Sequence, residues 1–311
     1  MLKRMLMVLV AVFSLFALTA CGERTYKADG VYAAFAESTN YGAPQITVVT
    51  VTIKNDKIES FYIDCLQSTA VKNEEDVVTG YNFNEKTKKE LRYDYRMHGP
   101  GMDEEEYLDY LEENNKLEWF EQAELLEAYF KENGTDLTVD KDGYIQNVSG
   151  VSIVDSDYSK LAKKAVENAK AGKVYSWVAT GGSTTNLIWA EGTVDKNGKL
   201  TSLKLDTRQG RITDGTFAWD EETKQEKGYD YRMHGPGMEE EAYLDYLEEN
   251  NKLEWFEQAD LLAAYVLENG LANVKYDDNG KLDNAPEAIA EVSVTVNHYV
   301  KVMKDLVDNW K

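Results

Sequence analysis

Cysteine and histidine are scarce in this chain, and each shortage excludes a class of protein. Its 311 residues include two cysteines, Cys21 and Cys65. Two are too few for a disulfide framework, a thiolate iron–sulfur cluster or a C-x-x-C-H haem attachment. The three histidines show no H-x-x-x-H or other paired spacing, so the sequence predicts no metal site. P-loops, dinucleotide fingerprints and nucleophilic triads are also missing.

Positive charge is the third shortage. The chain has 34 Lys and Arg against 56 Asp and Glu, a net charge of −22. Such an acidic surface repels nucleic acid and anionic lipid headgroups, so no nucleic-acid partner is expected. The ordinary role of this charge is to keep a secreted protein soluble.

The first residues have the pattern of a lipoprotein signal. Lys3 and Arg4 precede a short apolar run, Met5–Leu18, and Leu18-Thr19-Ala20-Cys21 fits a lipobox. The run is short for a membrane span, although an ordinary signal peptide or an anchor helix is the alternative. We therefore predict a signal peptide at 1–20, lipidation of Cys21 and a lipid-anchored tether at 21–29. The mature protein would then lie on the extracytoplasmic face of a bacterial cell membrane, tethered to the bilayer.

One long segment occurs twice. Residues 93–126 and 229–262 differ at only three of 34 positions, with a constant offset of 136. Each copy follows β-rich runs with Asn/Gly turns: 31–36, 46–53 and 57–65 in the first half, and 174–179, 187–194 and 199–206 in the second. Cys65 ends one run and reads as a small buried hydrophobe.

The duplicated block itself is expected to be helical. Asp103 and the acids after it suit a helix N-terminus, and a longer helix ends at Asn133-Gly134. Its apolar stripe, repeated in the copy, consists of Phe120, Ala123, Leu126 and Phe130, and of Phe256, Ala259, Leu262 and Val266. Each half closes with a short strand (143–148 or 280–282) and a helix. We predict an α+β fold of two tandem domains, 30–171 and 172–311, each an antiparallel β-meander with helices packed on it.

The closing segment carries a family resemblance. A meander opening on Asp29-Gly30-Val31-Tyr32, the segment Glu118-Trp119-Phe120-Glu121-Gln122, and Ser149-Gly150-Val151-Ser152 before a helix together resemble the FMN-binding domain family. The tandem layout with a lipobox, and the segments 88–91 and 95–97, resemble the surface lipoproteins of flavin-based extracellular electron transfer. This similarity covers nearly the whole mature chain.

The resemblance implies a flavin site. In that family a flavin transferase joins FMN through its phosphate to a hydroxyl, and Ser152 matches the acceptor, with Ser149 and Gly150 before it. A helix N-terminus after the acceptor would meet the phosphate charge. Gln146 and Val151 depart from the family's acid and alanine. In the second half Ser293 takes the acceptor position, with Glu291 close by. The alternative for 149–152 is a strand end and helix N-cap.

Two further sets of residues are candidates. One set could line a flat pocket for an aromatic ring: Tyr95, Met97, Trp119 and Gln122, with Tyr231, Met233, Trp255 and Gln258 in the copy. A recent duplication explains their identity equally well. His98 and His234 are the other set, and a polar loop role is favoured over metal binding.

The sequence therefore predicts a membrane-anchored extracytoplasmic flavoprotein that carries electrons in extracellular electron transfer. FMN would be covalent at Ser152, and otherwise held without a covalent bond or absent. The protein would be a carrier rather than a catalyst with its own acid and base. The expected partners are a flavin transferase and a membrane quinol or dehydrogenase as electron donor. The main alternative is a non-redox lipoprotein that binds flavin, quinone or another flat ligand reversibly through a degenerate FMN-binding fold. A third is a structural surface lipoprotein whose acidic helices contact a partner.

Overall fold

The computed structural model describes residues 24–310, a mixed α+β protein with two four-stranded antiparallel sheets. The expected signal peptide, 1–20, and Cys21 lie outside these residues. Residues 24–29, the described part of the expected tether, pack against the first half: Tyr26 and Ala28 are buried, and Lys27 N–H donates to the Ala169 carbonyl at 2.9 Å. Within 24–310 no helix has the length and apolar character needed to cross a bilayer.

The first sheet is a meander in the order β1-β2-β3-β4. Its strands are β1 (Gly30–Asn40), β2 (Ala43–Lys54), β3 (Lys57–Lys72) and β4 (Val78–Phe83). Asn55 and Asp56 join β2 to β3 with φ values of 52° and 60°, which is the geometry of the tight turn that fits two twisted antiparallel strands. The turn and the three predicted runs are confirmed, although the strands are longer than predicted and β4 was missed.

The second sheet repeats this order with β5 (Lys173–Thr180), β6 (Thr184–Val194), β7 (Leu200–Thr213) and β8 (Thr216–Trp219). Asp195 closes the β6–β7 turn, because its Oδ1 accepts from the N–H groups of Asn197 and Lys199 at 2.8 and 2.9 Å. The predicted boundary at 171/172 falls between the helix that ends at Ala171 and β5.

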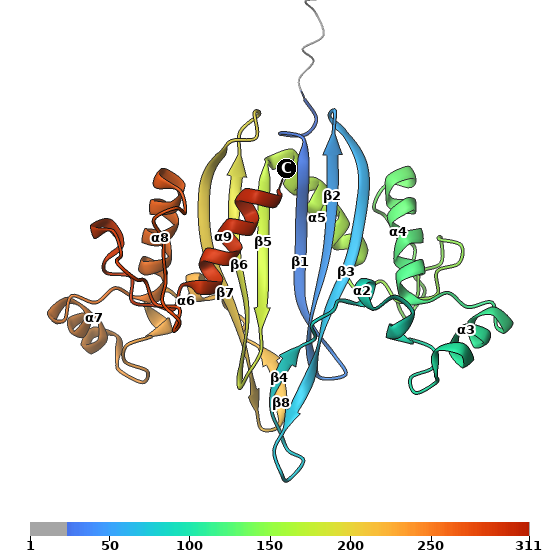
Figure 1. Ribbon diagram of the computed structural model, residues 1–311, viewed down its shortest axis with the longest axis horizontal. Coiled ribbons are helices and arrows are strands. Elements are labelled where there is room, and N and C mark those ends of the chain that lie inside the picture. The colour runs from blue at the N-terminus through green and yellow to red at the C-terminus, as the bar shows by residue number, and fades with distance from the viewer. Residues whose placement is uncertain (1–23, 311) are drawn as a thin grey trace, which may run out of the picture.

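Helices cover both sheets. The first half has α2 (Lys88–Leu91), η1 (Arg92–Tyr95), α3 (Glu104–Glu113), α4 (Trp119–Asn133) and α5 (Tyr158–Ala171). The second has α6 (Lys224–Lys227), η2 (Gly228–Tyr231), α7 (Glu240–Glu249), α8 (Trp255–Asn269), η3 (Glu287–Ile289) and α9 (Asn297–Asn309). Helix α4 packs on β3 and α5 on β1 and β2, while α8 packs on β7 and α9 on β5 and β6. In Figure 1, α3 and α4 form one outer flank and α7 and α8 the other.

The predicted helical pattern of the duplicated block is confirmed. Asp103 caps α3 by accepting from the Glu106 N–H, and α4 ends at Asn133 with Gly134 as its C-cap. The apolar stripe of α4 is buried throughout. In α8 the same stripe is buried except for Phe256, which is half-buried.

The predicted short strands at 143–148 and 280–282 are wrong. These segments form only isolated bridges, Val139 with Ile145, Tyr144 with Val154, and Tyr276 with Leu282. The segments that would have to pair with them are turns stabilised by Asp140 and Asp277, whose side chains accept local backbone N–H groups.

The two halves meet along β1 and β5, which lie side by side in the centre of Figure 1. Tyr81 of β4 and Gly182 of the β5–β6 turn exchange two backbone hydrogen bonds, at 3.1 and 2.7 Å. Phe35 of β1 contacts three aromatic rings of the second half, those of Tyr175, Trp177 and Trp189. The buried apolar residues of both halves form one continuous core.

Chain ends also cross this boundary. The Trp310 carbonyl, just after α9, accepts from the Val31 N–H at 2.7 Å, and its ring lies 6.2 Å from the Tyr32 ring. A side chain at Gly30 would place its Cβ 2.7 Å from Trp310. The end of the second half therefore completes the start of the first.

Candidate functional site

The segment 118–122 builds a rigid support at the start of α4. Glu118 is fully buried and forms a capping box with Glu121. One of its carboxylate oxygens accepts from the Tyr107 hydroxyl of α3 and from the Met97 N–H at 3.1 Å. Glu254 makes the same contacts with Tyr243 and Met233. The repeated acid thus ties α3, the 96–102 loop and α4 together, which is a structural role.

Gln122 connects this support to the closing segment. Its amide nitrogen donates to the Leu117 carbonyl at 2.8 Å, and its Oε1 accepts from the Ser152 N–H at 2.7 Å and the Ser152 hydroxyl at 3.3 Å. In the second half Gln258 holds Ser293 with equivalent bonds at 2.7 and 3.3 Å. Ser152 and Ser293 therefore occupy equivalent positions, although the sequences around them differ.

An open hollow of about 610 Å³ lies beside α4 in the first half. Four of the predicted residues line it: Tyr95, Met97, Trp119 and Ser152. The structure does not bring the others there. Gln122 is 1% exposed and lies behind Ser152, while Ser149 and Gly150 are exposed and outside the lining residues.

Lys88 is the main residue of the hollow that sequence reasoning missed. It is buried, and its ammonium lies 5.0 Å from the centre of the Tyr95 ring and 5.3 Å from that of Trp119. The described residues supply it with no carboxylate partner, whereas its neighbour Lys89 pairs with Glu127. A buried cation without a counter-ion is costly and marks a functional candidate. The sequence of segment 88–91 did not indicate that Lys88 is buried, because two adjacent lysines usually lie on an exposed turn of a helix.

The wall behind Lys88 is neutral and tightly packed. The Trp119 indole N–H donates to the Tyr158 hydroxyl at 3.2 Å, and burial raises the pKa of Tyr158 to about 12. Burial also raises the pKa of the Cys65 thiol to about 11, so Cys65 is the inert buried hydrophobe that the sequence predicted. The wall behind Lys88 therefore supplies no negative charge to balance its ammonium at neutral pH.

The second half has an equivalent lysine, Lys224, in a different electrostatic environment. Lys224 lies 4.6 Å from the Tyr231 ring and 5.2 Å from the Trp255 ring, and the Trp255 indole donates to the Tyr299 hydroxyl at 3.1 Å. Burial, and then the charge of Arg211, lower the pKa of Lys224 to about 8. Tyr231 and Trp255 thus lie around a lysine as Tyr95 and Trp119 do in the first half, while Gln258 contacts Met233 and holds Ser293.

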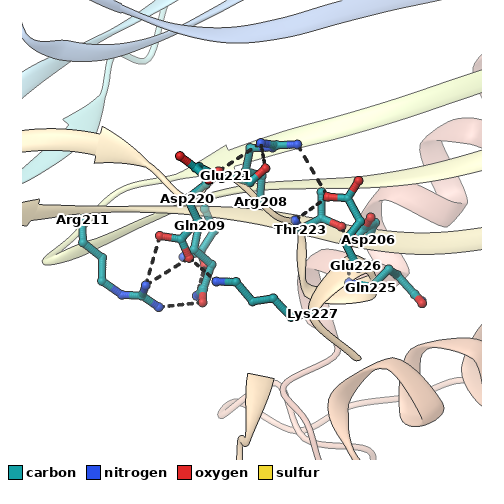
Figure 2. A network of polar contacts seen from close by, with 11 residues as sticks. Asp206, Arg208, Gln209, Arg211, Asp220, Glu221, Thr223, Gln225, Glu226 and Lys227 are labelled. Atoms are coloured by element: carbon teal, nitrogen blue, oxygen red, sulfur yellow. Dashed lines mark hydrogen bonds and ion pairs between the residues drawn. The ribbon is translucent and has the colours of Figure 1, made fainter. Parts of the chain in front are cut away.

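A polar network beside Lys224 distinguishes the halves. Arg211 bonds both carboxylate oxygens of Asp220, at 3.2 and 3.1 Å, and the Gln209 side chain at 2.9 Å, while Lys227 also contacts Asp220 (Figure 2). In the first half, Thr69 bonds Asn84 at the position of the Arg211–Asp220 pair. The second site therefore carries extra cations that the first lacks.

The closing motif differs from the expected helix N-cap. Helix α5 begins at Tyr158, six positions after Ser152, so residues 149–152 neither end a strand nor cap a helix. Asp155 holds the α5 N-terminus, accepting from the Ser159 N–H at 3.1 Å. A phosphate there would meet a carboxylate, so the expected helix-terminus charge is not offered to Ser152. The hollow offers Lys88 and Arg96 as cations instead, and of these Arg96 donates to the Met102 carbonyl.

His98 lies in the loop before α3, and His234 lies in the equivalent loop before α7. Nε2 of His98 contacts the Leu117 carbonyl at 3.0 Å, and Nε2 of His234 contacts the Leu253 carbonyl at the same distance. Within residues 24–310 no three His, Cys, Asp or Glu side chains are grouped so that they could hold a metal ion.

Comparison of this chain with protein-family models, with curated proteins and with solved structures finds no match in any of the three.

Proposed function

We propose that the hollow around Lys88 binds a planar aromatic ligand that carries negative charge, with FMN as the first candidate. The observation that supports this most is the convergence of a buried ammonium, which has no carboxylate partner among the described residues, with the rings of Tyr95 and Trp119. Flat ligands favour aromatic walls, and a partly buried cation favours an anionic group. The volume of about 610 Å³ lies within the range of small-molecule sites.

The residues fit FMN in three respects. Tyr95 and Trp119 supply ring contacts, Lys88 supplies the charge for a phosphate or for an electron-rich ring edge, and Ser152 places a hydroxyl among the lining residues. FMN, when bound, supplies one- and two-electron redox chemistry, while the protein binds and orients it. We further propose, from the sequence, that the protein is lipid-anchored through Cys21 on the extracytoplasmic face. There it would carry electrons from a membrane quinol or dehydrogenase to soluble acceptors.

A reversible binding module is the second candidate, and one observation favours it. The Ser152 hydroxyl donates to Gln122, and Asp155 occupies the nearby α5 N-terminus. Both contacts oppose phosphate at Ser152 and leave Lys88 as the anion site. In this case flavin, quinone or another flat ligand would bind without a covalent bond and without a redox role.

Titration of the full chain with FMN and riboflavin tests the binding proposal. We expect FMN to bind about tenfold more tightly than riboflavin, because only FMN carries the phosphate. Lys88→Met should remove this difference. Lys224→Met is the matched control, since it removes a similar lysine from the other half and should leave first-half binding unchanged. Equal affinity of wild type and Lys88→Met for FMN would contradict the site.

Intact-mass analysis after co-expression with a flavin transferase separates the covalent and reversible forms. A mass gain of one FMN that Ser152→Ala abolishes and Ser293→Ala retains supports covalent attachment. An unshifted wild-type mass together with reversible FMN binding supports the binding module. Absence of both rejects a flavin function.

A further inference from the structure

A second cavity lies between the two halves and is independent of the Lys88 hollow. Its volume is about 560 Å³. Its lining residues come from β1 and α5 of the first half, and from β5, β6, β7 and the start of α6 of the second. The cavity exists only where the halves are joined. It is large enough for a small organic molecule.

Three aromatic rings form part of its wall. Phe35 of β1 lies edge-to-face against Tyr175 of β5, with ring centres 5.8 Å apart, and against Trp189 of β6 at 5.9 Å. All three line the cavity and are only half-buried. Aromatic rings grouped in this way around a cavity attract organic cations through their electron-rich faces.

The lining residues carry a net negative charge, which attracts such a cation. Four carboxylates line the cavity, those of Glu37, Glu191, Asp206 and Glu226, against two cations, Lys164 and Arg208, which leaves a net charge of −2. The Lys164 side chain is 56% exposed and contacts Glu167 at 3.8 Å, and the Glu226 side chain is similarly exposed, at 58%. Arg208 is held by Glu37 at 3.0 Å and by the carbonyls of Asp220 and Glu221.

Asp206 and Glu226 are the carboxylates with the least compensation. Asp206 accepts from the N–H groups of Thr207 and Gln225, at 2.6 and 3.1 Å, and Glu226 accepts from the Thr223 N–H at 2.7 Å. The nearest cation to Glu226 is Arg208, at 3.9 Å. Figure 2 shows Asp206 and Glu226 next to each other beside Arg208. Burial, and to a smaller extent the charge of Glu226, raises the pKa of Asp206.

From the aromatic wall, the excess of carboxylates and the volume of this open cavity, we propose that the cavity between the halves binds a small organic ammonium ion. Its charged head lies toward Asp206 and Glu226, and its alkyl groups contact Phe35, Tyr175 and Trp189. Because residues of both halves bind it, occupancy stabilises their association by mass action.

Calorimetric titration of the full chain, purified in detergent, with choline is the test. Its uncharged carbon isostere, dimethylbutanol, has the same shape without the charge and serves as the ligand control. We expect choline to bind saturably. The isostere should bind at least about tenfold more weakly than choline. Asp206→Asn should weaken choline binding about tenfold.

Asp64→Asn is the matched protein control. Asp64 occupies the same place in the first half and accepts from two backbone N–H groups, at 2.7 and 3.1 Å, but it does not line the cavity. Its substitution should leave choline affinity unchanged. If Asp206→Asn does not fold, Trp189→Leu replaces it, with an expected loss of about fivefold or more. Equal affinities for choline and its isostere, or equal effects of the two Asp substitutions, would overturn the proposal.

Discussion

Replacing Lys224 by Met should make the protein more stable at neutral pH and remove a pH-dependent part of its stability. The Lys224 ammonium is half-buried against Tyr231 and Trp255 and has no carboxylate partner among the described residues. Burial and the charges of Arg211 and Lys227 disfavour its charged form. Met keeps the length and apolar contacts of the side chain while removing the charge.

The magnitude follows from the two pKa values. Lys224 titrates at about 8 in the folded protein and at 10.5 in the unfolded chain. Below pH 8 both states are protonated, and the folded state bears the full cost, on the order of 3 kcal/mol. As pH rises from 8 to 10.5 the unfolded chain binds more protons than the folded one, so the cost is relieved and stability rises. The two cation–π contacts of Lys224 offset about 1–2 kcal/mol of this cost. Lys224→Met should therefore raise the free energy of unfolding by about 1 kcal/mol near pH 7.

Urea unfolding of wild type and Lys224→Met, followed by far-ultraviolet circular dichroism between about pH 7 and pH 10, measures this effect. The difference between the two proteins cancels the titration of all other groups. We expect that difference to change by about 2–3 kcal/mol across the range and to reverse sign. A difference that stays constant with pH, or a variant less stable than wild type near pH 7, would refute the reasoning.

Three further predictions concern an ion pair, a side-chain hydrogen bond and the backbone contact between the halves. Lys89→Met leaves Glu127, 13% exposed, without its cation and should lower the free energy of unfolding by about 3 kcal/mol, measured by urea unfolding; unchanged stability contradicts the ion pair. Gln122→Leu leaves the Ser152 N–H without its acceptor and should cost about 2–4 kcal/mol, with faster hydrogen exchange at that amide, whereas retained protection would argue against the contact. Gly181→Ala places a Cβ 2.0 Å from a β4 carbonyl and should break the backbone bonds between the halves, at a cost of about 2 kcal/mol; intact exchange protection in β4 would disprove this.

The sequence predicted those elements whose pattern is local. The β-runs, the Asn55-Asp56 turn and the stripe of α4 depend on residues close in the chain, and each was found. Strands β4 and β8 were missed, because their short segments lack alternation and are stabilised by pairing with β3 and β7. The segment 143–148 was mistaken for a strand because its apolar residues pack into the core without a partner ladder.

Part of the candidate site could also be anticipated. Tyr95, Met97, Trp119 and Ser152 were selected from motifs and share one hollow. Lys88 was not selected, because its burial depends on rings that are seven and 31 positions away in sequence. Gln122 was taken for a ligand contact and instead positions Ser152, since nothing in a sequence distinguishes a pocket wall from the residue behind it.

The contact between Trp310 and the start of β1 has a consequence for biosynthesis. Gly30, Val31 and Tyr32 lie at the start of the first half, yet their partner Trp310 is synthesised only after the second half. A growing chain can form the β1–β2 and β2–β3 hairpins early, but the edge near Gly30 stays uncovered until residue 310 has emerged. The first half therefore reaches its final packing only after Trp310 has been synthesised. A truncation that removes Trp310 is expected to expose an edge in the opposite half of the molecule.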